Sequence, residues 1–140
     1  MAETYAGDIS ATDAWKILEA ETDAVLVDVR TDAEWAYVGL PDLAGIGKQP
    51  LLIPWQLFPN MAENADFARI MEESGTRRDA AHLFICRSGQ RSRFAAIAMT
   101  GLGFGRCYNV ADGFEGPHDE SGHRGRAAGW KVDGLPWKQG

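Results

Sequence analysis

The chain has 140 residues, the size of one domain, and 45% of them are hydrophobic, enough to form a core. Its formal net charge is −6, so it lacks the overall basic charge that a general nucleic-acid-binding protein uses to neutralise phosphates. We therefore expect one folded domain over residues 1–140, with no nucleic acid as a partner.

Neither the N-terminus nor the cysteine content predicts secretion or membrane insertion. Residues 1–5 lack the basic and apolar regions of a signal peptide, and no apolar run approaches the roughly 18 residues that a membrane span needs. The spacing of Cys86 and Cys107 does not suggest a disulfide framework. We expect a soluble, reduced, cytoplasmic protein with no membrane partner.

The first half of the chain alternates helical and strand patterns. Ser10 is a candidate N-cap of a helix whose apolar face carries Trp15 and Leu18. Residues 24–29 form an apolar run that is typical of a strand buried on both faces. The next expected elements are a short helix, a Gly/Pro-rich stretch, a short strand and a helix capped by Asn60, over residues 31–37, Gly39–Pro50, 51–53 and 60–74.

The second half continues the alternation. A strand over residues 82–85 ends at Cys86, a helix follows over residues 90–100, and a last strand covers residues 106–110. The apolar spacing in the helix predicts a core-facing stripe of Phe94, Ile97, Ala98 and Leu102. Alternating strands and helices predict an open, mostly parallel α/β sheet, whose ligands bind at the carboxyl ends of the strands.

One segment combines a cysteine with the features of an anion-binding loop. Cys86 leaves a buried strand and enters a polar loop that opens into a helix, with the sequence Cys86, Arg87, Ser88, Gly89, Gln90, Arg91, Ser92. Backbone N–H groups of such a loop, together with a helix N-terminus, surround an anion. The two arginines add positive charge, and glycine permits backbone angles that other residues resist. These features favour a thiolate at Cys86, a dianionic donor such as thiosulfate, and the terminal sulfur of a persulfide.

A structural cysteine is the alternative interpretation for a position at a strand end. We prefer it for Cys107, which lies inside a predicted strand without such a loop.

Four segments resemble the rhodanese family. The Cys86–Ser92 segment is similar to its active-site loop, and Asp28-Val29-Arg30 followed by Glu34-Trp35 is similar to its first motif. The segments 108–116 and 129–137 resemble the region after the last core strand and the C-terminal ending. The resemblance implies a central five-stranded, mostly parallel sheet with helices on both faces. It also implies a sulfurtransferase that moves sulfur from thiosulfate to cyanide or a cellular thiol through a Cys86 persulfide, with no metal and no cofactor.

Asp28, Arg30 and Glu34 are expected to support the loop rather than to react. Asp28 and Arg30 lie at the carboxyl end of a predicted core strand. We expect an Arg30–Glu34 ion pair to hold this region rigid, and Asp28 to accept hydrogen bonds from the loop or from Arg91.

Two segments depart from the family pattern. Residues 39–48 lack the family's usual histidine and are longer, which leaves the shape of one pocket wall open. Pro117–Ala128 is Gly-rich and polar; a solvated loop is the preferred interpretation, and a cover over the site is the alternative. Its His118 and His123 lack metal-ligand spacing, so no metal site is expected.

Three other functions compete with a free-standing sulfurtransferase. A cysteine phosphatase uses a Cys-x5-Arg loop, but Ser92 stands at the arginine position here and Arg91 comes one residue early, which makes a smaller cradle suited to sulfur. A regulatory rhodanese-like module without chemistry is the second competitor. The third is a sulfur carrier that exchanges persulfide with a protein partner.

Overall fold

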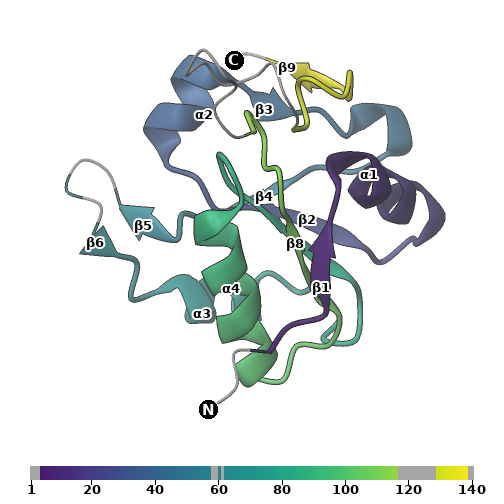
Figure 1. Cartoon of the computed structure of the whole chain (residues 1–140). Coiled ribbons are helices and arrows are strands. Elements are labelled where there is room, and N and C mark those ends of the chain that lie inside the picture. The colour runs from purple at the N-terminus through teal and green to yellow at the C-terminus, as the bar shows by residue number, and fades with distance from the viewer. Residues whose placement is uncertain (1–3, 58–59, 61, 117–128, 139–140) are drawn as a thin grey trace.

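A five-stranded parallel sheet forms the centre of the computed structural model, which describes residues 4–57, 60, 62–116 and 129–138 (Figure 1). The strand order is β1-β8-β7-β2-β4, and every neighbouring pair is parallel. In sheet order the strands are β1 (Gly7–Ile9), β8 (Cys107–Val110), β7 (His82–Ile85), β2 (Val25–Asp28) and β4 (Leu51–Leu52). The carboxyl ends of all five strands therefore meet at one edge.

Helices cover both faces of this sheet, as predicted. The helices are α1 (Ala11–Ala20), α2 (Asp32–Val38), α3 (Phe67–Glu73) and α4 (Gln90–Gly101). Helix α1 contributes to one core cluster, in which Leu18 packs with Leu26 and Leu83. Helices α3 and α4 contribute to a second cluster that includes Val27 and Phe84. Successive strand residues thus enter opposite clusters, because side chains alternate across a sheet.

The first two helices both begin with a side-chain cap, of which the Ser10 cap was predicted. The Ser10 side chain accepts a hydrogen bond from the Asp13 backbone N–H over 3.0 Å and caps α1. Thr31 caps α2, where Glu34 completes a capping box by accepting from the Thr31 backbone. Each cap supplies a partner for N–H groups that a helix end leaves unsatisfied.

The predicted helix cap at Asn60 is wrong. Gln56–Leu57 (β5) pairs with Ala62–Glu63 (β6) in an antiparallel hairpin, and Asn60 lies between these strands. Helix α3 begins only after Asp66, which makes no side-chain cap. Backbone pairing across the hairpin competes with helix formation here, and a cap residue alone does not decide between them.

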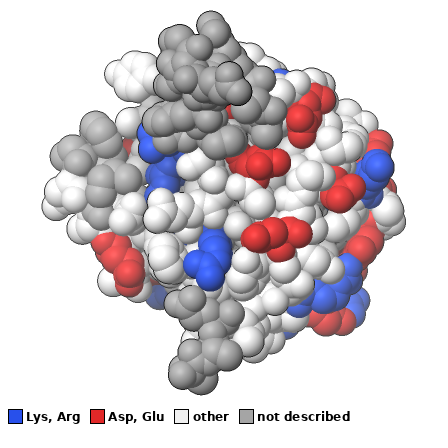
Figure 2. All heavy atoms as spheres, viewed as in Figure 1, with Lys and Arg blue, Asp and Glu red and all other residues white. Residues whose placement is uncertain are grey.

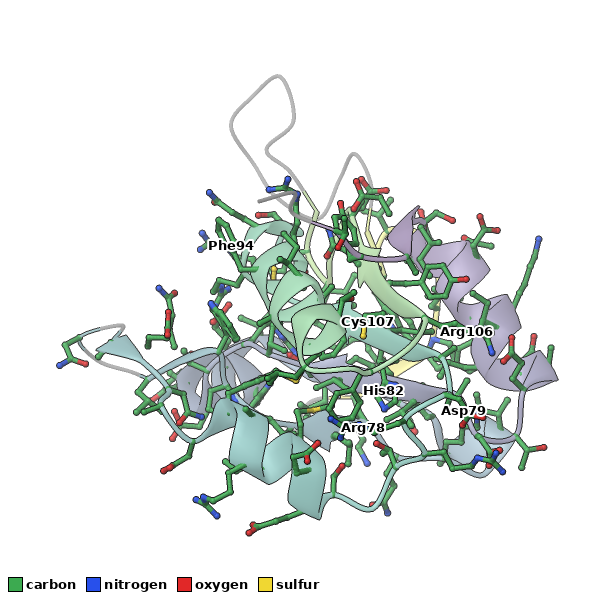
Figure 3. The ribbon with its side chains drawn as sticks, turned by 90° about the horizontal axis from the view of Figure 1, so that it is seen from below. Arg78, Asp79, His82, Phe94, Arg106 and Cys107 are labelled. Atoms are coloured by element: carbon green, nitrogen blue, oxygen red, sulfur yellow. The ribbon has the colours of Figure 1, made fainter. Side chains whose placement is uncertain are left out.

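The predicted core face after Cys86 is wrong for its largest members, although Ala98 packs against the second core cluster. Phe94 and Leu102 are 43% and 49% exposed, and Figure 3 shows Phe94 on the outer side of the helix. The buried residues of α4 are Ser92, Ala95, Ala96 and Met99. Small alanine side chains let the helix lie close against β7 and β8, and this close packing outweighs the burial of the larger apolar residues.

The Gly39–Pro50 stretch has structure of its own. It contains β3 (Leu40–Pro41), which pairs antiparallel with β9 (Trp137–Lys138), and a 3₁₀ turn over Ala44–Ile46. Pro117–Ala128, with both of its histidines, lies outside the described residues. No helix in the described part of the chain is long and apolar enough to span a membrane.

Candidate active site around Cys86

Cys86 lies at the carboxyl end of β7, in the loop that leads into α4. It is buried, with 1% of its surface exposed. The Gly89 backbone N–H donates to Sγ over 3.1 Å, and Ser92 Oγ lies 3.2 Å from Sγ. A buried charge needs such polar partners in place of water. The N-terminus of α4, with its positive dipole end, starts at Gln90 beside this cysteine.

The chain segment after β8, residues 111–116, supports the loop from behind. The Phe114 N–H donates to Cys86 O over 2.8 Å, and the Glu115 N–H donates to Arg87 O over 3.0 Å. This backbone pairing fixes the start of the loop at the end of the sheet.

Two glycines permit this close approach. A Cβ on Gly89, which has φ +98°, would lie 2.0 Å from Ala111 O. A Cβ on Gly113, which has φ +68°, would lie 2.4 Å from Arg87 O. Both positions need a positive φ and have no room for a side chain, so glycine is required at each.

Asn109, in β8, is a site residue that the sequence patterns did not reveal. It is 2% exposed, and its Oδ1 lies 2.5 Å from Ser92 Oγ. Its Nδ2 donates to Gly89 O over 3.1 Å and to Asp8 Oδ1, in β1, over 3.0 Å. The signal available in the sequence was a polar residue next to Val110 inside an otherwise apolar strand.

The ion pairs beside the loop differ from those expected. Arg30 pairs with Asp28 and not with Glu34: Nε and Nη2 donate to the carboxylate over 2.9 and 2.7 Å, and both residues are 0% exposed. The two residues are i and i+2 at the end of an extended strand, so their side chains lie on the same side. We expected Asp28 to accept a hydrogen bond from Arg91, but no such bond occurs among the described residues. The Asp28 carboxylate binds Arg30 instead.

Glu34 instead binds Arg91. Nη1 and Nη2 of Arg91 donate to the two carboxylate oxygens over 2.7 and 3.0 Å. Burial acts to raise the pKa of Glu34, but the hydrogen bonds and charge of Arg91, together with hydrogen bonds from Thr31, outweigh it and lower that pKa. Burial likewise acts to lower the pKa of Arg91, while Glu34, with smaller contributions from Cys86 and Asp28, raises it. Both side chains therefore stay charged, and the pair joins α2 to α4.

The Arg30 guanidinium is held by further contacts. It lies 4.2 Å above the Phe114 ring, and Nη2 donates to Gly39 O over 2.8 Å. In the described part of the chain, two buried donors, Arg30 Nη1 and Trp35 Nε1, have no hydrogen-bond partner. Asp28 and Arg30 thus hold the end of β2, the start of β3 and the segment after β8 together.

The other loop residues differ in exposure. Arg87 and Gln90 are exposed, and Ser88 is half-buried.

Cys107 is 0% exposed in the second core cluster, and burial raises the pKa of its thiol. Its position confirms the prediction that it packs in the core.

Neither a metal-binding cluster among the described residues nor a basic patch on the face drawn in Figure 2 stands out. No cluster of His, Cys, Asp and Glu among the described residues is suited to a metal. Figure 2 shows acidic and basic side chains interspersed over the face drawn, with no extended basic surface on its described residues.

Comparison with solved structures supports the fold. A crystal structure of a protein from M. tuberculosis, Rv0390, superposes with a TM-score of 0.90 at 44% sequence identity, and the match covers 98% of this chain and all of that one. The solution structure of the polysulfide-sulfur transferase homodimer from Wolinella succinogenes matches 95% of this chain and 78% of that chain, with a TM-score of 0.62 and 20% identity. The chain therefore has a rhodanese-like fold.

Sequence relatives range from uncharacterized proteins to sulfurtransferases. An uncharacterized protein of Rickettsia rickettsii is 39% identical over 131 residues, which cover 94% of this chain and 96% of that protein. The thiosulfate sulfurtransferase GlpE of Actinobacillus pleuropneumoniae is 27% identical over 136 residues, or 97% of this chain and 95% of that enzyme. The family described as the STR4 middle domain matches residues 6–140. The chain belongs to this STR4 middle-domain family.

Proposed function

We propose that this chain is a sulfurtransferase that carries sulfane sulfur as a persulfide on Cys86. The observation that carries the proposal is the Gly89 N–H, which donates to Cys86 Sγ over 3.1 Å beside the N-terminus of α4. Hydrogen bonds and a positive helix end stabilise a sulfur anion.

In the first step the Cys86 thiolate attacks the outer sulfur of an anionic donor such as thiosulfate. A new S–S bond forms to Sγ, the S–S bond of the donor breaks, and sulfite leaves with the bonding electron pair. The negative charge passes to the terminal sulfur of the persulfide. Exposed Arg87 is placed to attract the incoming dianion.

In the second step a thiophilic acceptor, cyanide or a thiolate, attacks the terminal sulfur. The acceptor–sulfur bond forms, the persulfide S–S bond breaks, and Cys86 returns to the thiolate. This is a ping-pong reaction with a covalent intermediate, and it draws only on residues of the chain.

The arrangement of Arg91 argues against a phosphatase. A phosphatase loop uses its arginine as a bidentate clamp on the phosphoryl group. Both terminal nitrogens of Arg91 already bind Glu34, and Ser92, at the position of the phosphatase arginine, lies against the cysteine sulfur.

Mass spectrometry of the intact protein after incubation with thiosulfate tests the proposal. We expect an added mass of one sulfur atom, located on Cys86 by peptide mapping and removed by cyanide or a reducing thiol. Cys107→Ser is the matched control, since it removes the buried cysteine and should leave the adduct unchanged, whereas Cys86→Ser should abolish it. The proposal fails if no adduct forms or if the adduct maps to Cys107.

A protein donor is the second candidate, because sulfur carriers use the same persulfide. If Cys86 gains sulfur rapidly only from a persulfidated protein and slowly from thiosulfate, the physiological donor is a protein. Comparison of the two loading rates at equal concentrations of donor distinguishes these cases.

A further inference from the structure

We infer that Asn109 is a positioning residue that holds the Ser92 hydroxyl proton away from the Cys86 thiolate and so keeps the thiolate nucleophilic. The inference rests on the proposed role of Cys86. It assigns a function to a buried chain of contacts from Cys86 through Ser92 and Asn109 to Asp8.

The Ser92 hydroxyl faces two acceptors but has only one proton. Its Oγ lies 3.2 Å from Cys86 Sγ and 2.5 Å from Asn109 Oδ1. Ser92 is 0% exposed, so bulk water does not supply a further donor. The proton therefore goes either to the sulfur or to the amide oxygen.

The orientation of the Asn109 amide is set by its other contacts. Nδ2 lies 3.1 Å from Gly89 O and 3.0 Å from Asp8 Oδ1, and both of these atoms are acceptors. A flipped amide would direct its oxygen at them, so Oδ1 has to face Ser92. Tyr5 Oη donates to the same Asp8 oxygen over 2.8 Å and fixes that carboxylate in turn.

The preferred direction of the Ser92 proton changes with the state of Cys86. A thiol can donate to Ser92 Oγ, and Ser92 then donates to Asn109, which satisfies every group. A thiolate competes with Asn109 for the same proton. In the persulfide the charge has moved to the terminal sulfur, so Sγ is a weak acceptor. The Ser92 hydroxyl then donates to Asn109 without giving up a strong hydrogen bond to Sγ. Asn109 thus destabilises the free thiolate relative to the persulfide, which favours transfer of sulfur to a thiolate once it has formed. It also destabilises the thiolate relative to the thiol, which lowers the fraction of thiolate at a given pH.

Alkylation of Cys86 by iodoacetamide as a function of pH tests this without any sulfur transfer. We expect Asn109→Leu, which has a similar shape and no polar atoms, to free the Ser92 proton for the thiolate. The pH midpoint of alkylation should fall by about one unit, which means about tenfold more thiolate at a pH below both midpoints. The maximal rate at high pH should fall, since a better stabilised thiolate is a weaker nucleophile.

The same substitution in a Ser92→Ala background is the matched control. Without the hydroxyl there is no proton to redirect, so Asn109→Leu should leave the midpoint and the maximal rate unchanged there. Asp8→Asn, at an exposed position, is a second variant. It weakens the hydrogen bond that fixes the orientation of the Asn109 amide, and it should shift the midpoint in the same direction by a smaller amount. It carries the test alone if Asn109→Leu does not fold.

Two results would overturn the inference. One is an unchanged midpoint in both variants, and the other is a shift of equal size with and without Ser92. Failure of the proposed function looks different: the wild-type chain would gain no sulfur from any donor, whereas the alkylation shifts would remain.

Discussion

Gly89→Ala tests whether close contact with the segment after β8, residues 111–116, determines the conformation of the Cys86–Ser92 loop. The new Cβ would lie 2.0 Å from Ala111 O, which is a backbone atom and cannot rotate away. Ala111 is itself held to the sheet, since its N–H donates to Ile9 O over 3.0 Å. The loop must therefore move, and the Gly89 N–H moves away from Cys86 Sγ with it.

Two terms set the expected size of the effect. A non-glycine residue at φ +98° costs roughly 1–3 kcal/mol in backbone strain. Forcing an atom into a packed contact costs roughly another 1–3 kcal/mol. We expect Gly89→Ala to lower the free energy of unfolding by about 2–6 kcal/mol.

Two other glycines separate these terms. Gly75 has φ +81°, but a Cβ placed on it would have no atom within 4 Å, so Gly75→Ala carries strain alone and should cost about 1–2 kcal/mol. Gly101 has neither a positive φ nor a close neighbour, and as a helix residue Gly101→Ala should be neutral or stabilising by up to about 1 kcal/mol.

Urea denaturation of the three variants and the wild-type chain at one pH gives the four free energies. Sulfur loading of Cys86 from thiosulfate, measured where each variant is still folded, reports the loop itself and should be lost in Gly89→Ala alone. The reasoning is refuted if Gly89→Ala costs no more than Gly75→Ala and loads sulfur normally.

Three further predictions concern buried or partly buried ionisable side chains. Asp28→Ala leaves Arg30, which is 0% exposed, without its carboxylate and should cost about 3–5 kcal/mol in urea denaturation; a loss below about 1 kcal/mol would contradict a structural role for the pair. Because the pKa of Glu34 is lowered in the folded state, its pairing with Arg91 stabilises the fold above pH 4.5, the ordinary pKa of this carboxyl, and this contribution is lost as pH falls through the lower folded pKa. Glu34→Gln should lower the free energy of unfolding by about 1–3 kcal/mol at neutral pH and flatten the acid side of the plot of stability against pH. A variant whose plot runs parallel to that of the wild-type chain would contradict this prediction. Burial lowers the pKa of His82, although its hydrogen bond with Ala80 O opposes this. The fold should therefore have its full stability above pH 6.5, the ordinary pKa of histidine, and lose stability as pH falls toward the lower folded pKa. His82→Asn should remove this pH dependence of the melting temperature between about pH 7 and 5, and an unchanged pH dependence would refute the prediction.

Local signals in the sequence predicted the elements that depend on neighbouring residues. Ser10 and Thr31 cap α1 and α2 because an N-cap and its N–H partners lie within three positions of each other. The apolar runs that became β2 and β7 are continuous because both faces of those strands are buried. The placement of Cys86 at a strand end followed from the same pattern.

The sequence did not decide between a helix and a hairpin, or between two possible buried faces of a helix, where the local signals were similar. Residues 56–63 form a hairpin in place of the helix start expected at Asn60, because strand pairing supplies backbone partners that one cap residue does not. Phe94 in α4 and Leu102, just after it, are exposed, whereas Ala95 and Ala96 are buried, because the helix lies close to the sheet. Only the packed structure reveals which alternative has the lower free energy.

The sequence by itself determined that Cys86 enters a polar loop at the end of a buried strand, because the strand, the glycine and the helix start are adjacent in the chain. Only the tertiary structure decided what surrounds that loop. It brings Asn109 to Ser92 across 17 positions and Glu34 to Arg91 across 57. Parallel strands and their helices place distant residues side by side, and a long-range partner is chosen by this geometry, which no pattern of neighbouring residues encodes.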